Sequence, residues 1–239
     1  MPDYKELNNI IANGGDIVFF GGAGVSTESG IPDFRSTDGL YSMTFKHPPE
    51  TMLSRGFFMS NTEEFFEFYK NKMLFLEAMP NKCHLKLAEL EKKGRVKAVV
   101  TQNIDGLHQK AGSENVLELH GSVHRNYCMK CGQLYDVGFI LNSPAVPKCG
   151  CGGIVRPDVV LYGETLDNEL MARAVRHIMR ADILIIGGTS LGVYPAASLC
   201  ECFQGRNLVL INKSATNMDS EANLIIRDSI GEVFSKIQS

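Results

Sequence analysis

The sequence lacks the features that would mark a membrane, secreted or nucleic-acid-binding protein. No apolar run approaches the ~18 residues of a membrane span, and residues 1–6 lack a charged-then-apolar leader pattern. The 24 Lys and Arg against 27 Asp and Glu give a net charge of −3, without the basic excess that sequence-independent nucleic-acid binding needs. Internal repeats and low-complexity tracts are also missing. We therefore expect a cytoplasmic monomer with no membrane and no direct nucleic-acid partner.

Short apolar runs rich in Val and Ile alternate with helical stretches along most of the 239 residues. The runs are nearly continuous rather than alternating, which is typical of parallel strands covered on both faces. Strands that alternate with helices predict an α/β fold, a Rossmann-like, mostly parallel, doubly wound sheet. The strand candidates are residues 17–20, 96–100, 116–119, 183–186, 208–211 and 224–226.

Two segments interrupt this alternation. Residues 39–78 are rich in Phe and Met, and they contain no strand candidate, which predicts a helical insertion. Residues 122–157 hold four cysteines and five glycines but few core residues, so this small module needs something other than burial to hold it. We expect the Rossmann-like domain to be assembled from residues 1–38, 79–121 and 158–239.

The four cysteines of the small module have the spacing of a metal site. Cys128 and Cys131 form one close pair, and Cys149 and Cys151 form a second pair further along the chain. In a reducing compartment such clusters favour a metal over disulfides, and this spacing is that of a zinc ribbon. Four thiolates leave no position for water, so the site would be structural. The alternatives are two disulfides, or a ribbon that binds nucleic acid, for which basic residues are few.

A glycine-rich turn follows the first strand candidate. Residues 17–20 lead directly into Gly21-Gly22-Ala23-Gly24, and a strand that ends in glycines before a helix is typical of phosphate binding. The dinucleotide fingerprint is incomplete, because its third glycine falls on Thr27 and no acidic residue follows a second strand. A tight turn without a ligand is the alternative.

Polar residues follow four further strand candidates. In an open α/β sheet, ligands bind beyond the carboxyl ends of the strands, so these residues should face one site. Each strand end alone is ordinary loop chemistry, whereas all of them together predict a binding site. They are residues 101–108, 120–122, 187–191 and Asn212.

In this order, these motifs resemble those of the sirtuins, which are NAD-dependent protein lysine deacylases. The resemblance spans nearly the whole chain, and the chain is similar to a compact, bacterial-type catalytic core. The motifs that carry it are Gly22-Ala23-Gly24-Val25-Ser26, Gly30-Ile31-Pro32-Asp33-Phe34-Arg35, residues 101–108, His120-Gly121-Ser122, the four cysteines, Gly188-Thr189-Ser190-Leu191 and Asn212.

The resemblance implies two cofactors: NAD, and one structural Zn²⁺ held by the four cysteines. The glycine turn and its neighbours would hold the pyrophosphate, and Phe34 would cover the nicotinamide ribose. Ile104 and Asp105 would receive the nicotinamide carboxamide. The implied NAD-binding residues are Gly22, Ala23, Gly24, Phe34, Arg35, Gln102, Asn103, Ile104, Asp105, Gly188, Thr189, Ser190, Asn212 and Asp228.

The same resemblance implies that His120 is the general base, a role that suits an ordinary pKa near 6.5. The acyl oxygen of a modified lysine would attack the nicotinamide ribose, and nicotinamide would leave. His120 would then help a ribose hydroxyl attack the imidate. The products would be free lysine, nicotinamide and 2′-O-acyl-ADP-ribose. The alternatives are an ADP-ribosyltransferase that uses the same NAD pocket, or a non-catalytic NAD sensor.

The implied partners are acylated-lysine proteins or peptides. The peptide would add as a strand beside residues 159–164, and substrate contacts would come from Phe34, Val160, Leu161, Tyr162 and Val193. Relatives that prefer succinyl or malonyl lysine share a Tyr-x-x-Arg pair, which here reads Tyr69-x-x-Lys72. We therefore predict deacetylation first, with weak activity on acidic acyl groups. The alternative is that Lys72 is a solvated helix charge.

Overall fold

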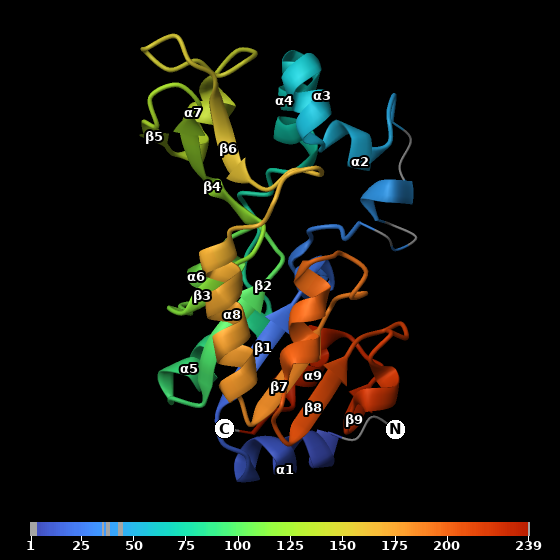
Figure 1. The fold of residues 1–239 in the computed structure, drawn as a ribbon. Coiled ribbons are helices and arrows are strands. Elements are labelled where there is room, and N and C mark those ends of the chain that lie inside the picture. Colours follow the sequence, from blue (N-terminus) through green and yellow to red (C-terminus); the bar gives the residue numbers. More distant parts are fainter. Residues whose placement is uncertain (1–3, 35, 37–38, 43–44, 239) are drawn as a thin grey trace.

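The computed structural model describes residues 4–34, 36, 39–42 and 45–238, and its larger lobe is built on one parallel sheet (Figure 1). The six strands run in the order β3-β2-β1-β7-β8-β9, and every neighbouring pair is parallel. The order reverses between β1 and β7, which makes this the point where a doubly wound sheet binds ligands. The strands are β1 (Ile17–Gly21), β2 (Val96–Thr101), β3 (Val116–Glu118), β7 (Ile183–Gly187), β8 (Asn207–Ile211) and β9 (Leu224–Ile226).

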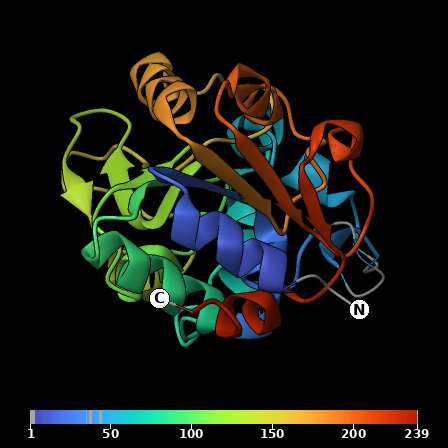
Figure 2. The same cartoon turned by 90° about the horizontal axis from the view of Figure 1, so that it is seen from below.

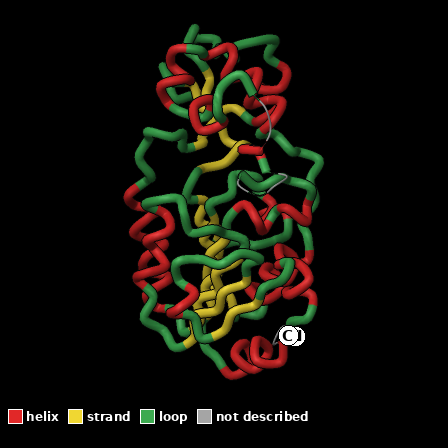
Figure 3. Tube along the Cα trace, turned by 90° about the vertical axis from the view of Figure 1, so that its right-hand side faces the viewer, coloured by secondary structure: helices red, strands yellow, loops and turns green. Residues whose placement is uncertain are grey.

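The apolar runs of the sequence fill both faces of this sheet, which confirms the predicted fold class. Ile17 and Phe19 face a core that also contains residues of three helices, while Val18 and Phe20 face a second core on the other side. Figures 2 and 3 show helices on both sides of the sheet. The first core is covered by α1 (Tyr4–Asn13), α5 (Lys82–Lys92) and α9 (Ile230–Ser235), the second by α8 (Asn168–Arg180) and the 3-10 helix η4 (Ala196–Cys202).

Local sequence signals set where the longer helices begin. The Asn81 side chain accepts a hydrogen bond from the backbone of Cys83 at the start of α5, and His84 completes a capping box. Asp167 caps α8 through the backbone N–H of Leu170. These caps fix where α5 and α8 begin against the two faces of the sheet.

The two segments that interrupt the alternation form the second lobe together (Figure 1). Their side chains share one buried core, in which Phe58, Phe65 and Tyr69 of the helical segment meet Val155 of the cysteine segment and Leu161, which follows that segment. The helical segment holds the 3-10 helix η3 (Leu40–Ser42), α2 (Pro49–Met52), α3 (Arg55–Ser60) and α4 (Thr62–Lys72). The cysteine segment holds β4 (Gly121–Cys128), β5 (Leu134–Tyr135), α7 (Val137–Asn142) and β6 (Val155–Val159), with the strands in the antiparallel order β5-β4-β6.

A lysine bridge also joins the two segments of this lobe. The Lys70 ammonium on α4 donates to the backbone carbonyls of Ser143 and Ala145, just after α7. Four short helices complete the elements of the described residues. None of the helices described is long and apolar enough to cross a membrane. The four short helices lie in loops between the strands and longer helices. They are η1 (Ala23–Val25), η2 (Thr27–Ser29), α6 (Leu107–Lys110) and η5 (Asp219–Glu221).

Candidate active site

The glycine turn after β1 is shaped by its contact with the loop after β7. The backbone N–H of Gly24 donates to the carbonyl of Gly188 over 2.8 Å, and a Cβ on Gly24 would lie 2.9 Å from the Gly188 backbone. A Cβ on Gly22 would lie 2.8 Å from the Thr189 Cβ. Gly188 itself has a φ of +59°, in the left-handed region. The two loops therefore approach this closely because both are glycine-rich.

A buried hydroxyl joins the glycine turn to the loop after β2. The Ser26 Oγ donates to the Asp105 Oδ2 over 2.7 Å and accepts from the Asn103 Nδ2 over 3.0 Å. The other oxygen of Asp105 accepts the backbone N–H of Leu107 at the start of α6. Asn103 and Asp105, both implied to bind NAD, therefore converge on Ser26. Ser26 is the last residue of the glycine motif, but nothing in the sequence pattern predicted this role for it.

Gln102 connects three strand ends at the same edge of the sheet. Its backbone N–H donates to Gly21, and its Nε2 donates to the Thr189 Oγ1 over 3.1 Å. Its carbonyl lies 2.9 Å from the Nδ1 of His120, just after β3. The structure thus brings together the loops after β1, β2, β3 and β7, four of the five strand ends expected to meet. Asn212, after β8, bonds instead to Ser214 and Ile226.

His120 is held in one orientation and one tautomer by that contact. Because a carbonyl oxygen can only accept, Nδ1 carries the proton and Nε2 keeps its lone pair. Burial lowers the pKa of His120, and the bond to the Gln102 carbonyl opposes part of that shift. The ring is therefore neutral near pH 7, with a free acceptor nitrogen, as a general base requires.

The segment after β6 is fixed by a buried ion pair that the sequence reasoning missed. Two nitrogens of Arg156 contact the two oxygens of Glu164 at 2.6 and 2.9 Å, and the two side chains are 10 % and 17 % exposed. Arg156 also donates to the Val159 carbonyl, and Glu164 accepts the N–H of Leu161. Both neighbours of Val160 are thereby tied to one salt bridge.

Val160, between these two anchors, connects the segment to the proposed base. Its backbone N–H donates to the His120 carbonyl over 3.0 Å, and its side chain is half-buried. Leu161 is buried, whereas Tyr162 is exposed and contacts the Tyr41 hydroxyl through its own at 2.7 Å. Val193 is half-buried and accepts the N–H of Ala197 at the start of η4.

The remaining implied NAD residues lie in several places. Phe34 and Ile104 are half-buried and pack against the core of the second lobe, and Phe34 meets Tyr41 edge to face. Asn212 follows β8 directly, whereas Asp228 accepts the Tyr4 hydroxyl, a bond that lowers the pKa of its carboxyl. Ala23 opens η1, Ser190 is exposed, and Arg35 lies outside the described residues.

Tyr69 and Lys72 stand in different surroundings on α4. Tyr69 is 0 % exposed and stacks on Phe65 at 5.7 Å, and burial raises the pKa of its phenol. Lys72 is exposed, and its ammonium lies 5.9 Å from the ring centroid of Phe45. The structure therefore gives Lys72 an aromatic neighbour, but it leaves the acyl preference as a proposal.

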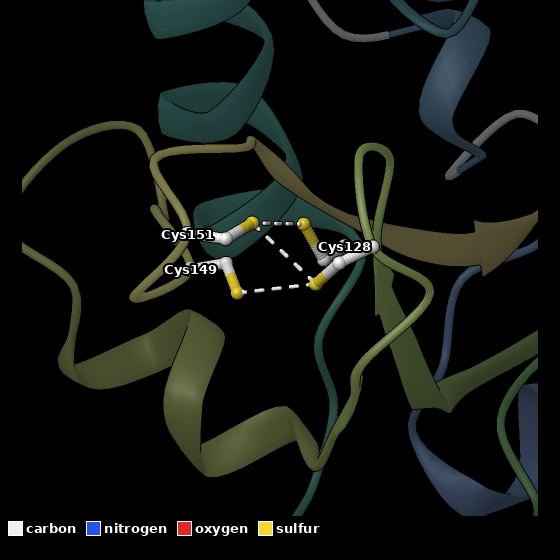
Figure 4. A group of neighbouring side chains, drawn as sticks. Cys128, Cys149 and Cys151 are labelled. Atoms are coloured by element: carbon white, nitrogen blue, oxygen red, sulfur yellow. Dashed lines mark hydrogen bonds between the residues drawn. The ribbon is translucent and has the colours of Figure 1, made fainter.

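The four cysteine sulfurs gather where β4 ends at Cys128, and Figure 4 shows Cys128, Cys149 and Cys151 of this cluster. All lie within 4.8 Å of one another, and the sulfur contacts Cys128–Cys151, Cys131–Cys149 and Cys131–Cys151 measure 3.5, 3.6 and 3.4 Å. A disulfide needs about 2.05 Å, whereas tetrahedral ligands about 2.3 Å from zinc lie about 3.8 Å apart. The donor set therefore fits Zn²⁺, and the disulfide alternative fails.

Hydrogen-bond donors around the sulfurs also suit thiolates. The backbone N–H of Lys130 donates to the Cys128 sulfur over 3.4 Å, and the Tyr135 hydroxyl donates to the Cys149 sulfur over 3.0 Å. A Cβ on Gly153 would lie 2.6 Å from the Cys128 sulfur. A glycine at this position keeps the second cysteine loop close to the first.

The doubly wound sheet, its glycine turns and the four-cysteine module define a Rossmann-like dinucleotide-binding protein with an inserted zinc module. A model of the Sir2 family matches residues 22–195, and the chain belongs to that family. An NAD-dependent protein deacetylase of Clostridium acetobutylicum is 59% identical over 237 residues, covering 98% of this chain and 97% of the relative. One of Clostridium perfringens has the same identity and coverage.

Solved Sir2 structures match the fold of this chain over nearly its whole length. A Sir2 structure with a deacetylated p53 peptide and 3′-O-acetyl-ADP-ribose is 40% identical, with a TM-score of 0.90, and covers 99% of this chain and 97% of its own. A Sir2 structure with a p53 peptide and NAD+ is 40% identical, with a TM-score of 0.88, and covers 98% and 96%. The chain is similar to both in fold and in extent.

Removal of one cysteine ligand tests the zinc site. We expect Cys128→Ser to lose bound zinc and to lower Tm, because structural zinc supplies about 10–16 kcal/mol in small peptides and the module has little core. Elemental analysis and thermal unfolding measure both effects. Cys202→Ser is the control, since Cys202 lies on η4, outside the cluster, and should keep about one zinc per chain. Purified wild-type protein that folds and works without zinc would contradict the assignment.

Removal of the arginine tests the buried ion pair. We expect Arg156→Met to lower the free energy of unfolding by about 3–5 kcal/mol, because the carboxylate of Glu164, which is 17 % exposed, loses its partner. Adding Glu164→Leu to this variant should recover part of the loss. Urea unfolding measures both variants. A loss of about 1 kcal/mol or less is the value for an exposed ion pair. It would show that the Arg156–Glu164 pair does not hold this part of the structure.

Proposed function

We propose that this chain is an NAD-dependent protein lysine deacetylase that transfers the acyl group to ADP-ribose. The products are free lysine, nicotinamide and 2′-O-acyl-ADP-ribose. The observation that carries the proposal is His120, a neutral base oriented by Gln102 and bonded to Val160 of the substrate-facing segment. It stands in a chain 59% identical to relatives named NAD-dependent protein deacetylase.

The glycine turn and the polar loops around it fit NAD. When bound, NAD supplies a ribose carbon that takes up the acyl oxygen as nicotinamide leaves. Gly22, Ala23 and Gly24 would hold the pyrophosphate, with Gly188 and Thr189 against them. Because the Asp105 carboxylate accepts from Ser26 and from Leu107, it would meet the carboxamide N–H already in position.

The same assignment extends to the remaining residues. Arg35 and Ser190 would bind phosphate, and Gln102 and Asn103 would bind the ribose. Phe34 would cover the ribose, Ile104 would join Asp105 at the carboxamide, and Asn212 and Asp228 would meet the adenosine end.

The role of His120 follows from its tautomer. Nε2 accepts a proton from the ribose hydroxyl that takes up the acyl group, while the Nδ1 proton stays on the Gln102 carbonyl. The positive charge that then develops on the ring is stabilised by that carbonyl. An ADP-ribosyltransferase does not need this proton transfer, so the oriented base favours deacylation.

The peptide would add as a strand beside residues 159–162, with Val193 on its other side. Backbone pairing gives affinity with little sequence preference. The chain would act as a cytoplasmic monomer without a membrane or nucleic-acid partner.

Replacement of the base tests the function directly. We expect His120→Asn to lower the rate of acetyl-peptide deacetylation by about 10²–10⁴-fold, the usual contribution of a general base. Mass spectrometry of peptide and nicotinamide gives the rate. Because burial lowers the pKa of His120, the acidic limb of the wild-type pH profile of kcat/KM should have an apparent pKa below 6.5.

The half-buried His177 on α8 lies outside the proposed site, so His177→Gln is the matched control and should keep wild-type activity. Gain of ADP-ribose on the target would support the transferase instead. NAD binding without nicotinamide release would support a sensor.

Comparison of acyl groups tests Lys72. We expect acetyl-lysine to be the best substrate, with weak turnover of succinyl-lysine that falls further in Lys72→Ala. A lysine attracts a carboxylate only as a point charge and cannot pair with it bidentately. Parallel assays of acetyl and succinyl peptides, with the exposed Lys93→Ala as control, measure the preference. Wild type without succinyl turnover would mean that Lys72 is a solvated helix charge.

A further inference from the structure

Arg125 connects two carboxylates that come from different lobes. Its Nη1 lies 2.5 Å from the Glu118 Oε2, and its Nε donates to the Asp158 Oδ2 over 2.9 Å. Glu118 ends β3 of the large sheet, whereas Asp158 lies on β6 of the small sheet. One guanidinium therefore spans the junction between the two sheets.

Both carboxylates lie two residues from a group of the proposed active site. Glu118 precedes His120 by two positions, and Asp158 precedes Val160 by two. The backbones already meet here, because the Val160 N–H donates to the His120 carbonyl over 3.0 Å. A Cβ on Gly121 would lie 1.9 Å from the Asp158 carbonyl oxygen. Arg125 and its two carboxylates, here called the clamp, thus lie where the proposed base and the proposed peptide-binding segment come closest.

The shape of β4 brings Arg125 to this position. The pairing of β4 with β6 shifts register between Ser122 and Asn126, and Arg125 lies in that irregular stretch. The Glu118 side chain is 7 % exposed, so its charge is largely removed from water, whereas that of Arg125 is 52 % exposed. Without the guanidinium, two carboxylates would face each other and one would be buried.

We propose that Arg125 is a positioning residue for the deacetylation reaction, and this role rests on the function proposed above. By holding Glu118 and Asp158 together, it fixes the distance between His120 and the peptide-binding segment around Val160. The planar guanidinium reaches both carboxylates at once through different nitrogens, which a lysine ammonium does less well.

An ordinary half-exposed ion pair would contribute little and would leave the site unchanged. The two descriptions differ in what happens to the Val160–His120 hydrogen bond when Arg125 is removed. A positioning role requires that this bond open more often, whereas a surface pair leaves it intact.

Amide hydrogen exchange measures how often the Val160–His120 hydrogen bond opens, and it does not require enzyme activity. We expect Arg125→Gln to speed exchange of the Val160 N–H by about tenfold or more. Amides of β7 should keep their protection, because the loss of one contact opens only the part of the structure around it. Lys93→Gln, which breaks the exposed Lys93–Glu89 pair on α5, is the matched control and should change neither. Unchanged exchange at Val160 in Arg125→Gln overturns the proposal, whatever the enzyme does.

Steady-state kinetics supply the second readout. We expect Arg125→Gln to raise the acetyl-peptide KM or lower kcat by about 5- to 20-fold, since a displacement of ~1 Å can cost ~100-fold. The KM for NAD should stay within about twofold, and Arg125→Lys should restore part of the loss. A parallel loss of NAD affinity, peptide affinity and Tm would mean a general structural defect and overturn the proposal.

A double-mutant cycle adds the pairwise contribution. Arg125→Gln combined with Asp158→Asn should cost less than the sum of the two single losses in peptide kcat/KM, because both break one contact. Purely additive losses overturn the clamp. If the wild-type protein does not deacetylate any acyl-peptide, the proposed function fails, while the exchange result still decides the role of Arg125.

Discussion

The buried ion pair between Arg156 and Glu164 is the contact on which the site depends. Between them, the two side chains hold the carbonyl of Val159 and the N–H of Leu161, which fixes the backbone on either side of Val160. The Arg156 guanidinium also lies over the ring of Phe58 at 5.5 Å and near that of Tyr127 at 5.8 Å. Because Phe58 belongs to the helical segment and Tyr127 to the cysteine segment, one cation orients three parts of the chain. A buried salt bridge is weak support for stability, but here its geometry sets the backbone of the segment proposed to bind the peptide.

The zinc site acts on the same region through one strand. β4 begins at Gly121, next to His120, and ends at Cys128, one of the four clustered cysteines. The cysteine cluster therefore fixes the far end of the strand whose near end adjoins the proposed base. Four thiolates complete the coordination of zinc, so its contribution is to hold this strand rather than to take part in the chemistry. The shared core with the helical segment adds the apolar contacts that the small module lacks alone.

The elements that sequence reasoning predicted are those whose signal is local. Six apolar runs match the six strands of the sheet, and the four cysteines come together as their spacing indicated. Ser26 was missed because its partner Asp105 is remote in sequence. Arg125 was missed because it lies in an irregular stretch of β4, where no periodicity marks it. Arg156 lies only eight residues from Glu164, but a charged pair at that spacing is usually solvated, and only its burial shows its role. The joint core of residues 39–78 and 122–157 involves two segments that each have a weak pattern, so their pairing could not be predicted.

Gln102 explains why the site is organised before any ligand arrives. Its N–H, side chain and carbonyl bind three different loops, those of Gly21, Thr189 and His120. The close contact of Gly24 with Gly188 sets the distance between two of these loops, and Gln102 then relates both to the base. A displacement of the glycine turn would therefore also turn the imidazole, and the cost of orienting the base is met in folding rather than during the reaction. This arrangement couples the loops proposed for NAD to the residue proposed for proton transfer, so the two functions share one set of hydrogen bonds.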